Sequence, residues 1–476
     1  MEPRKKALFT FRSTEGEYVL YWMQASVRVR ANLALVEAAA QARSLGCPLA
    51  VVFCLTAFPE ANARSFAFLL DGLQDVAASL DDLGVSFTVV RGEPIDVVPL
   101  CGRLARLVVF DRGYLPIQRR WRERVAAALP CPVLEVEDNV AVPVETVSTK
   151  SEWSAATLRP KLMRLAELET LSEPVWSPVA APSHLKERWK LAGVEVLDAV
   201  PSRQDLARFG NQAGHVPATE LPGGERAAWR AWTTFAQTRL ERYDSDRNDP
   251  NLDATSGLAP YLHFGHITPL TILAELKSNG LWKPALSYRR SGEDPVSKFL
   301  DELLVRRELA VNAAWYNPEF ASFAGLPQWA RRTLANHALD RREFLYTPEQ
   351  WEAALTHDPA WNAAQTELVT TGRLHGTLRM YWGKKLLEWS ADPAEAFDLA
   401  LRLNNKYALD GRDPNSAAGV AWCFGAHDRP WGERPVYGLV RCMTSGGLAR
   451  KFDLAAYLRR FTRPSSPPPL QRSLPL

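Results

Sequence analysis

The stretch that decides the fold of the first part of the chain is YVLYWMQASVRVRANLALVEAAAQARSLGCPLAVVFC, residues 18–54. It begins and ends with short apolar runs, YVLYWM and LAVVFC, each of the length of a strand. Between them, apolar residues recur at helical spacing and predict a helix over Val29–Leu45 that ends at Gly46. A strand, a helix and a second strand in this order indicate a parallel α/β unit.

The same alternation continues to about residue 140. Three further apolar runs, FTVV, RLVVF and VLEVE, are separated by amphipathic segments such as SFAFLLDGLQDVAASLDDLG. They predict a Rossmann-like parallel α/β domain over residues 1–140. Because no G-x-G-x-x-G motif follows the first strand, the sheet lacks the usual dinucleotide fingerprint, and any ligand would bind differently.

Beyond residue 140 the pattern changes. Prolines punctuate residues 141–224, which predicts a long interdomain linker with short helices. Residues 225–462 are rich in Ala, Leu, Arg and Glu and predict a second domain that is all-α. The tail, residues 463–476, is rich in proline and serine and is expected to be disordered.

Length and composition favour a soluble protein of two domains. At 476 residues the chain is longer than a single hydrophobic core usually supports. It is 46% hydrophobic and 23% charged, and its formal net charge of +3 permits a nucleic-acid partner without requiring one. Any DNA-binding surface would therefore be local.

The sequence shows neither a targeting segment nor a metal motif. The N-terminus lacks the apolar core of a secretory signal, and no run of about 18 apolar residues could span a bilayer. The six cysteines form no C-x-x-C pair, and no histidines accompany them at zinc-ligand spacing. We expect a cytoplasmic protein with reduced thiols, no metal and no membrane partner.

A tryptophan pattern marks the C-terminal half. Trp382 and Trp389 are seven residues apart in GTLRMYWGKKLLEW, and Trp361 lies shortly upstream. Seven residues are two helical turns, so both indoles would lie on one face of a helix. Such a line of rings suggests electron transfer, whereas the alternative is that the indoles only fill a core.

Two segments place polar groups where a ligand could bind. RNDPNLDATSGLAPYLHFG carries Ser256 and Gly257 before an expected helix, whose exposed N–H groups suit a phosphate; an ordinary helix cap is the alternative. FLDELLVRREL places Glu302 and Arg307 in an apolar helix, where some of the charges would pair or meet a ligand. The alternative there is a solvated helix face with surface ion pairs.

Two later segments combine polar and aromatic residues. LNNKYALDGRDPNS supplies Asn404 and Asp410 around a tight turn, a set able to hydrogen-bond a heterocycle, although turn formation alone would also explain it. AWCFGAHDRPWGERPVYGLVR interleaves Trp422 and Trp431 with three arginines, as expected where bases stack and phosphates are neutralised. An arginine-rich loop that packs on aromatic rings is the alternative.

Taken together, these segments resemble the class II cyclobutane pyrimidine dimer (CPD) DNA photolyases, flavoproteins of the photolyase and cryptochrome family. The resemblance covers nearly the whole chain. It rests on six motifs in the family's order: YWMQASVRVRANLAL, RNDPNLDATSGLAPYLHFG, FLDELLVRREL, DPAWNAAQTELVTTGRLHGTLRMYWGKKLLEW, LNNKYALDGRDPN and GAHDRPWGER.

The resemblance implies a fold and an activity. The family joins a Rossmann-like α/β domain, through a long linker, to an all-helical domain that holds FAD. Its reduced flavin absorbs light and donates an electron to a pyrimidine dimer flipped out of the duplex, whose cyclobutane ring then splits. Flipping costs a few kcal/mol and is cheapest for a damaged, poorly paired dinucleotide.

The resemblance also assigns a substrate pocket. Glu302 matches the acidic residue that hydrogen-bonds the dimer and stabilises the charge that develops on its carbonyl. Met380 and Trp422 match positions that pack on the dimer. Asn404 matches the residue at the N5 edge of the flavin.

Further positions match residues that bind the cofactor and the DNA. Those expected to contact FAD are Tyr243, Ser256, Gly257, Leu258, Arg307, Arg379 and Asp410. Those that match electron-transfer tryptophans are Trp382, Trp361 and Trp389. Those expected near the lesion or the DNA backbone are Arg247, Arg429, Trp431 and Arg441.

Several alternatives stay open. A cryptochrome-like photoreceptor would use the same flavin without repairing DNA, and a variant could act on the 6-4 photoproduct instead of the CPD. An antenna chromophore, a deazaflavin or a folate, could occupy the N-terminal domain. The resemblance suggests a monomer that acts on UV-damaged DNA and has no obligate protein partner.

Overall fold

The computed structural model describes residues 4–8, 15–169, 182, 184–208, 216–282 and 294–461, which form two compact units. Unit 1 consists of Met1–Thr149, Leu162–Thr234 and Gly257–Ala285, and unit 2 of Lys150–Lys161, Phe235–Ser256 and Leu286–Leu476. This division differs from the predicted boundaries after residues 140 and 224, because most of the expected linker belongs to unit 1. The tail expected to be disordered, residues 463–476, lies outside the described residues.

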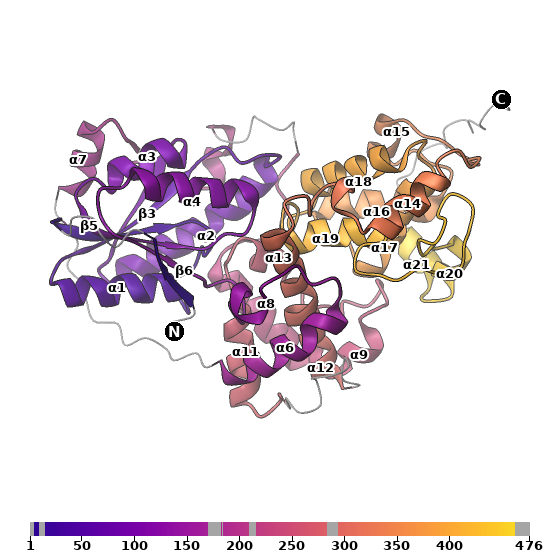
Figure 1. The fold of residues 1–476 in the computed structure, drawn as a ribbon, viewed down its shortest axis with the longest axis horizontal. Coiled ribbons are helices and arrows are strands. Elements are labelled where there is room, and N and C mark those ends of the chain that lie inside the picture. Colours follow the sequence, from indigo (N-terminus) through magenta and orange to yellow (C-terminus); the bar gives the residue numbers. More distant parts are fainter. Residues whose placement is uncertain are drawn as a thin grey trace. The chain divides into compact units, whose positions relative to one another are not determined.

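A seven-stranded sheet forms the centre of unit 1, with the strand order β1-β6-β5-β2-β3-β4-β7 (Figure 1). Its strands are β1 (Lys5–Ala7), β2 (Tyr18–Met23), β3 (Leu49–Leu55), β4 (Ser86–Arg91), β5 (Ala105–Asp111), β6 (Val133–Val136) and β7 (Glu195–Val196). The central pairs are parallel, as predicted, and the two edge strands are antiparallel. The edge strands were not predicted, because two or three residues are too few to show a periodic pattern.

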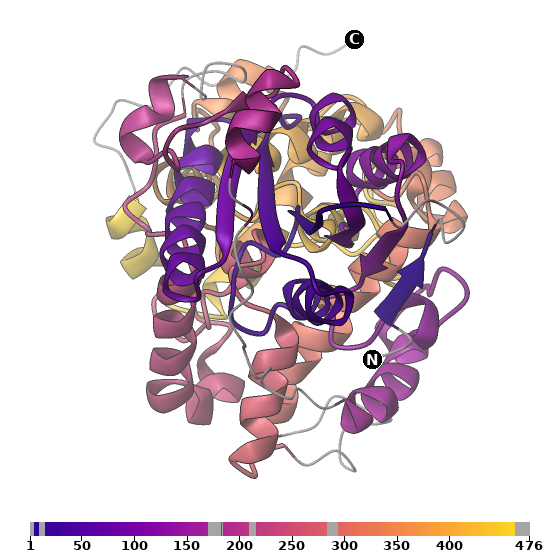
Figure 2. The same ribbon diagram turned by 90° about the vertical axis from the view of Figure 1, so that its left-hand side faces the viewer.

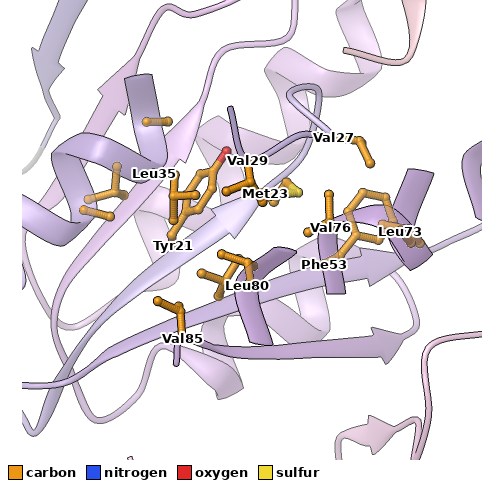
Figure 3. Packing of buried hydrophobic residues seen from close by; sticks show 14 of the residues in the cluster. Tyr21, Met23, Val27, Val29, Leu35, Phe53, Leu73, Val76, Leu80 and Val85 are labelled. Atoms are coloured by element: carbon orange, nitrogen blue, oxygen red, sulfur yellow. The ribbon is translucent and has the colours of Figure 1, made fainter. Parts of the chain in front are cut away.

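The sheet separates two hydrophobic cores, because successive side chains of a strand point to opposite faces. Val19, Tyr21 and Met23 of β2 pack with α1 (Leu33–Leu45) and α2 (Ala63–Asp82), as Figure 3 shows in part. The alternate residues of β2 pack on the other face. The helices of that face are α3 (Pro94–Cys101), α4 (Pro116–Ala128) and α7 (Leu185–Leu191) (Figure 2).

Helix α1 begins at Leu33, so the predicted start at Val29 was wrong. The backbone N–H of Val29 donates to the Glu225 carboxylate at 2.8 Å, which holds this segment outside the helix. The side chain of Asn32 accepts the N–H of Leu35 at 2.8 Å and caps the first turn. The helix ends as predicted, at Gly46 with a φ of 62°.

The turn after β2 shows why a dinucleotide fingerprint is missing. The carboxylate of Asp111, at the end of β5, accepts the backbone N–H groups of Gln24, Ala25 and Ser26 at 2.5–3.0 Å. It also accepts the hydroxyl of Tyr21 at 3.0 Å, and burial raises its pKa. A phosphate would need these N–H groups, so the carboxylate already occupies the place of a bound anion.

Further short helices belong to unit 1 or cross its boundaries along the chain, except the 3₁₀ helix η3, which belongs to unit 2. They are α5 (Val144–Val147), α6 (Ala155–Leu168), the 3₁₀ helix η2 (Arg203–Arg208), α8 (Glu225–Thr238), the 3₁₀ helix η3 (Leu240–Arg242), α10 (Ala259–His263) and α11 (Pro269–Ser278). None of the helices in the described ranges combines the length and the apolar character that a bilayer crossing requires.

All the regular elements in the described part of unit 2 are helices, which confirms the predicted class of the second domain. Its main helices are α9 (Tyr243–Asp246), α12 (Pro295–Leu300), the π-helical turn η5 (Asp301–Arg306), α13 (Arg307–Tyr316), the 3₁₀ helix η6 (Phe323–Gly325), α14 (Gln328–Asn336), α15 (Pro348–Glu352), α16 (Pro359–Thr371), α17 (Gly376–Glu388), α18 (Pro393–Tyr407), α19 (Pro414–Cys423), α20 (Ser445–Ala449) and α21 (Leu454–Phe461). Helix α19 packs against α13, α17 and α18. These four helices position the candidate site.

Candidate active site

Glu302 lies in η5, the π-helical turn between α12 and α13. Its carboxylate accepts a hydrogen bond from Nη1 of Arg247 at 2.9 Å, and its side chain is 46% exposed. The guanidinium of Arg247 also lies over the ring of Tyr243, 5.5 Å from the ring centroid. Such π-helical turns interrupt the regular ladder and occur frequently at functional sites. Glu302 and Arg247 therefore form a charged, solvent-accessible pair that a polar ligand could contact, and the buried ring of Tyr243 packs beneath the guanidinium.

Trp422 is half-buried in α19 and carries a cation on its ring face. The guanidinium of Arg306 lies 4.8 Å from the ring centroid, and Nε of Arg306 pairs with Asp301 at 3.4 Å. Arg159 holds the other oxygen of Asp301 at 2.7 Å. This network fixes Arg306 over the indole, where a cation–π contact contributes about 0.5–2 kcal/mol. Met380, also half-buried, lies in α17, which packs against α19.

A cluster of hydrogen-bonding groups surrounds Arg379 of α17. The guanidinium binds both oxygens of Asp410 at 3.0 and 3.1 Å, Oδ1 of Asn404 at 3.1 Å and Oγ of Ser416 at 3.1 Å. Asn404 in turn donates to Ser416 at 2.8 Å. The structure thus brings Asn404, Arg379 and Asp410 together. Their alternation of donors and acceptors in a largely buried place fits the edge of a flat heterocycle.

Ser416 is a member of this cluster that sequence reasoning missed. It is buried in the first turn of α19, which Asp413 caps, and it links Asn404 to Arg379. The only signal in the sequence was the DPNS segment, which marks a helix start without showing what the serine contacts.

The other predicted cofactor residues are divided between the units. Tyr243 is buried in unit 2, 5.6 Å from the ring of Phe299, and its pKa is raised to about 12 by burial. Arg307 is buried at the start of α13, and Ser256 belongs to unit 2. Gly257, with a φ of 68°, and the buried Leu258 belong to unit 1. Their roles toward a cofactor stay predictions.

Trp382 and Trp361 form a stacked, fully buried pair. Their ring centroids are 6.2 Å apart and their planes differ by 9°. Nε1 of Trp361 donates to the carbonyl of Trp382 at 3.0 Å, and Nε1 of Trp382 donates to Gln365 at 2.8 Å. Asp358 caps α16 through the N–H groups of Ala360 and Trp361, which sets the position of the second indole. The pair is therefore held rigidly.

A fourth tryptophan, Trp351, which the sequence analysis did not single out, connects this pair to Trp389. The ring of Trp351 in α15 lies 4.5 Å from Trp361 and 6.0 Å from Trp389, and it stacks on Trp389 at 12°. The line of indoles therefore runs Trp382, Trp361, Trp351 and Trp389, and all four are buried. No sequence spacing could have shown this, because Trp351 comes from a separate short helix.

Three of the four residues predicted near the lesion or the DNA backbone, Arg429, Trp431 and Arg441, are exposed on one loop, residues 428–441, whereas Arg247 pairs with Glu302. Trp431 is 38% exposed, and the guanidinium groups of Arg429 and Arg441 lie 5.2 and 4.6 Å from its ring centroid. Asp428 accepts Nε1 of Trp431 at 3.2 Å. The backbone N–H of Trp431 donates to the carbonyl of Leu439 at 2.8 Å, which closes the loop. Two cations and one indole are thus presented to solvent as a group.

His337, at the end of α14, connects this loop to the helix. We call its contacts with Asp340 and Glu433 the latch. Nδ1 of His337 contacts Asp340 at 2.7 Å, and Nε2 contacts Glu433 of the loop at 3.0 Å. Asp340 also accepts the N–H of Val436 at 2.8 Å. The hydrogen bonds to Asp340 and Glu433 raise the pKa of His337, and those from Val436 and His337 lower the pKa of Asp340. A protonated His337 therefore joins two carboxylates across the latch.

This latch predicts a pH-dependent stability. Because the folded pKa of His337 is raised, its contribution is full below its unfolded pKa of about 6.5 and is lost as pH rises through the folded value. We expect His337→Gln to lower the melting temperature most near about pH 6 and progressively less at alkaline pH. Thermal unfolding across this range measures the difference, with His184→Gln as an exposed-histidine control. A difference that stays constant with pH would contradict the latch.

The comparisons with known proteins agree with this architecture. Residues 19–182 match the DNA photolyase family. Deoxyribodipyrimidine photo-lyase of Methanothermobacter thermautotrophicus is 44% identical over 94% of this chain and 94% of its own length. Cryptochrome-2 of Gallus gallus is 27% identical over 76% of this chain and 61% of its length. The chain belongs to the DNA photolyase family.

A solved structure shows the same fold at low sequence identity. The archaeal photolyase from Sulfolobus tokodaii, crystallised with two FAD molecules, superposes with a TM-score of 0.67 and 16% identity. The match covers 93% of this chain and 90% of that chain. Within the family, the identity to the photo-lyase of Methanothermobacter exceeds the identity to the cryptochrome and spans more of both chains.

Proposed function

We propose that this chain is a light-dependent photolyase that repairs cyclobutane pyrimidine dimers in DNA, of class II, with FAD as its cofactor. One observation carries the proposal: α17 bears both Arg379, the centre of the polar cluster, and Trp382, the first indole of the buried line. They are three residues apart, so both project from the same side of the helix. A heterocycle held by Arg379 would lie beside an electron donor.

The residues of unit 2 fit the polar edge of a flavin. Asn404 offers an amide, Arg379 a guanidinium and Asp410 a carboxylate, and their mutual hydrogen bonds fix their orientation. A guanidinium beside the ring would favour a negative charge on it. When bound, reduced FAD would supply the light-excited electron that splits the dimer. By the resemblance, we assign its phosphates and ribityl chain to Tyr243 in α9 and to the segment with Ser256, Gly257 and Leu258.

Glu302 would bind the substrate. Its carboxylate binds Arg247 in the structure, so a dimer carbonyl that approaches Glu302 must share or replace this partner. A proton held between the carboxyl group and the dimer carbonyl would stabilise the negative charge that arrives there. Met380 and Trp422 supply the apolar surface on which a flipped dinucleotide could pack.

The exposed loop would hold the DNA, and its contribution is measurable. We expect Arg441→Ala to weaken binding similarly for all sequences and to reduce the slope of log K against log salt by about 1, because one phosphate contact is lost. Fluorescence anisotropy over a salt series measures this slope. Arg459→Ala, an exposed arginine on α21, is the control. An unchanged slope in Arg441→Ala would remove this residue from the DNA surface.

The central test is repair itself. UV-irradiated thymine oligonucleotide is incubated with chemically pre-reduced protein in blue light and in darkness, and the remaining dimers are counted. Loss of dimers only in light supports the proposal. No loss of dimers, with reduced FAD bound, would favour a photoreceptor. The same assay on an oligonucleotide with a 6-4 photoproduct tests whether the protein repairs that lesion instead. We further propose that the protein acts on damaged DNA as a cytoplasmic monomer without an obligate protein partner.

A further inference from the structure

Two tryptophans differ from the others by their exposure. Of the tryptophans among the described residues, Trp153 and Trp431 are the most exposed, at 66% and 38%. An indole is a large apolar ring with a polar edge, and such rings are enriched where proteins bind their partners. Trp431 belongs to the loop of residues 428–441, which we propose to hold the DNA. Trp153 lies outside this loop, so its exposure calls for a separate explanation.

The backbone around Trp153 is fixed to unit 2. Trp153 lies in the segment Lys150–Lys161, which belongs to this unit. On one side, the backbone N–H of Glu152 donates to Oδ1 of the buried Asn312 in α13 at 2.7 Å. On the other side, the carbonyl of Ser154 accepts a backbone N–H of α6 at 3.2 Å. An ordered backbone thus carries the exposed indole, which reduces the entropy that a partner must remove on binding.

His427 connects Trp153 to the start of the loop of residues 428–441. Nδ1 of His427 contacts the carbonyl of Trp153 at 3.1 Å. Burial lowers the pKa of His427, so its ring is neutral at pH 7, and Nδ1 carries the proton that the carbonyl accepts. The next residue, Asp428, accepts Nε1 of Trp431. The two exposed tryptophans are therefore linked through two consecutive residues.

The segment that carries Trp153 is also bonded to the surface proposed for the dimer. Arg159, on the same segment, pairs with Asp301 at 2.7 Å. Asp301 also pairs with Arg306, whose guanidinium lies over the ring of Trp422. The segment of Trp153 is thus bonded both to the loop for the DNA and to the residues on which a flipped dimer could pack.

The surroundings of Trp153 favour a nucleic acid over a protein or a membrane. Residues 150–152 and Ser154 are polar, so the chain does not extend the indole into the larger apolar area that a protein interface or a membrane surface requires. The neighbouring loop adds the exposed cations Arg429 and Arg441. Aromatic rings beside cations bind unpaired bases by stacking, and a flipped dimer leaves bases of the duplex unpaired.

We propose that Trp153 is a DNA-binding residue that stacks on an unpaired base next to the flipped dimer. The face of the indole contacts the base, and the fixed backbone of residues 152–154 holds the ring in place. Trp153 contributes to the affinity for DNA and takes no part in splitting the dimer. The inference rests on the proposed function, because the unpaired base arises when the dimer is flipped.

Fluorescence anisotropy with a duplex that contains a dimer, and with FAD-loaded protein in darkness, tests the affinity. We expect Trp153→Ala to raise the dissociation constant by about 5- to 150-fold, the range of base–aromatic stacking. The slope of log K against log salt should stay natural because no charge is lost, unlike in Arg441→Ala. Trp153→Phe should recover part of the affinity. A natural dissociation constant in Trp153→Ala would overturn the inference.

The matched control is Leu191→Ala. It removes another exposed apolar side chain, from α7 of unit 1, and should bind DNA like the natural protein. Dimer repair per absorbed photon, measured with saturating DNA, should be natural in both variants. If Trp153→Ala bound DNA naturally but no longer formed a dimer of two chains seen by sedimentation of the natural protein, the indole would belong to an interface between copies instead.

A fluorescent base locates the contact. We place 2-aminopurine opposite the dimer or beside it, one position at a time, because stacking on an indole quenches its emission. At one position, quenching should occur with the natural protein and Leu191→Ala and be lost with Trp153→Ala. If no position depended on Trp153, the inference would fall, and light-dependent repair would leave the proposed function intact. A natural protein that neither prefers damaged DNA nor repairs it would overturn both.

Discussion

We expect Glu302→Gln to lower the number of dimers repaired per absorbed photon by about tenfold or more. The reason is that a hydrogen bond to a charged group contributes about 1.5–3 kcal/mol, and the amide cannot share a proton with the charge on the dimer carbonyl. The same substitution also breaks the ion pair with Arg247 at 2.9 Å. Repair of UV-irradiated thymine oligonucleotide by pre-reduced protein under counted photons measures the yield.

Two comparisons make this prediction specific. Glu319→Gln, an exposed glutamate after α13, should keep the natural yield. Flavin absorption and DNA affinity should stay close to natural in Glu302→Gln, because among the described residues Glu302 hydrogen-bonds to Arg247 and to no member of the polar cluster around Arg379 or of the loop 428–441. A natural yield in Glu302→Gln would show that the dimer charge is stabilised by another group.

The second large effect is expected for Trp382→Phe. Photoreduction of oxidised flavin should fall by about tenfold or more, whereas repair by chemically pre-reduced protein should survive. Phenylalanine fills the place of the indole but is much harder to oxidise, and it loses the hydrogen bond to Gln365. Flavin bleaching under blue light with a thiol reductant measures the first activity, and the oligonucleotide assay measures the second.

A buried tryptophan outside the line provides the matched control. Trp232 is equally buried, and its Nε1 donates to Glu275 at 2.7 Å, so Trp232→Phe loses a comparable hydrogen bond in unit 1. It should leave photoreduction unchanged. If Trp382→Phe lost both activities equally, its effect would be structural, and the separate role of the indole line in reducing the flavin would have to be abandoned.

The sequence by itself determined the elements and most of the candidate residues. Apolar runs of strand length marked β2 to β6, because a parallel strand is buried on both faces and must be apolar throughout. The seven-residue spacing of Trp382 and Trp389 predicted a shared helix, and α17 carries the first indole while the second caps its end. Periodicity and capping act within a few residues, so they are visible in the sequence.

Only the tertiary structure decided which residues meet. Glu302 and Arg247, 55 positions apart, pair because separate helices of unit 2 bring them within 2.9 Å. The indole line passes through Trp351 because this ring, on α15, contacts Trp361 on α16 and Trp389 at the end of α17. Such contacts depend on how helices pack, and no local pattern encodes the partner. The residue types of the candidate site were therefore predictable from the sequence, and the contacts between them only from the tertiary structure.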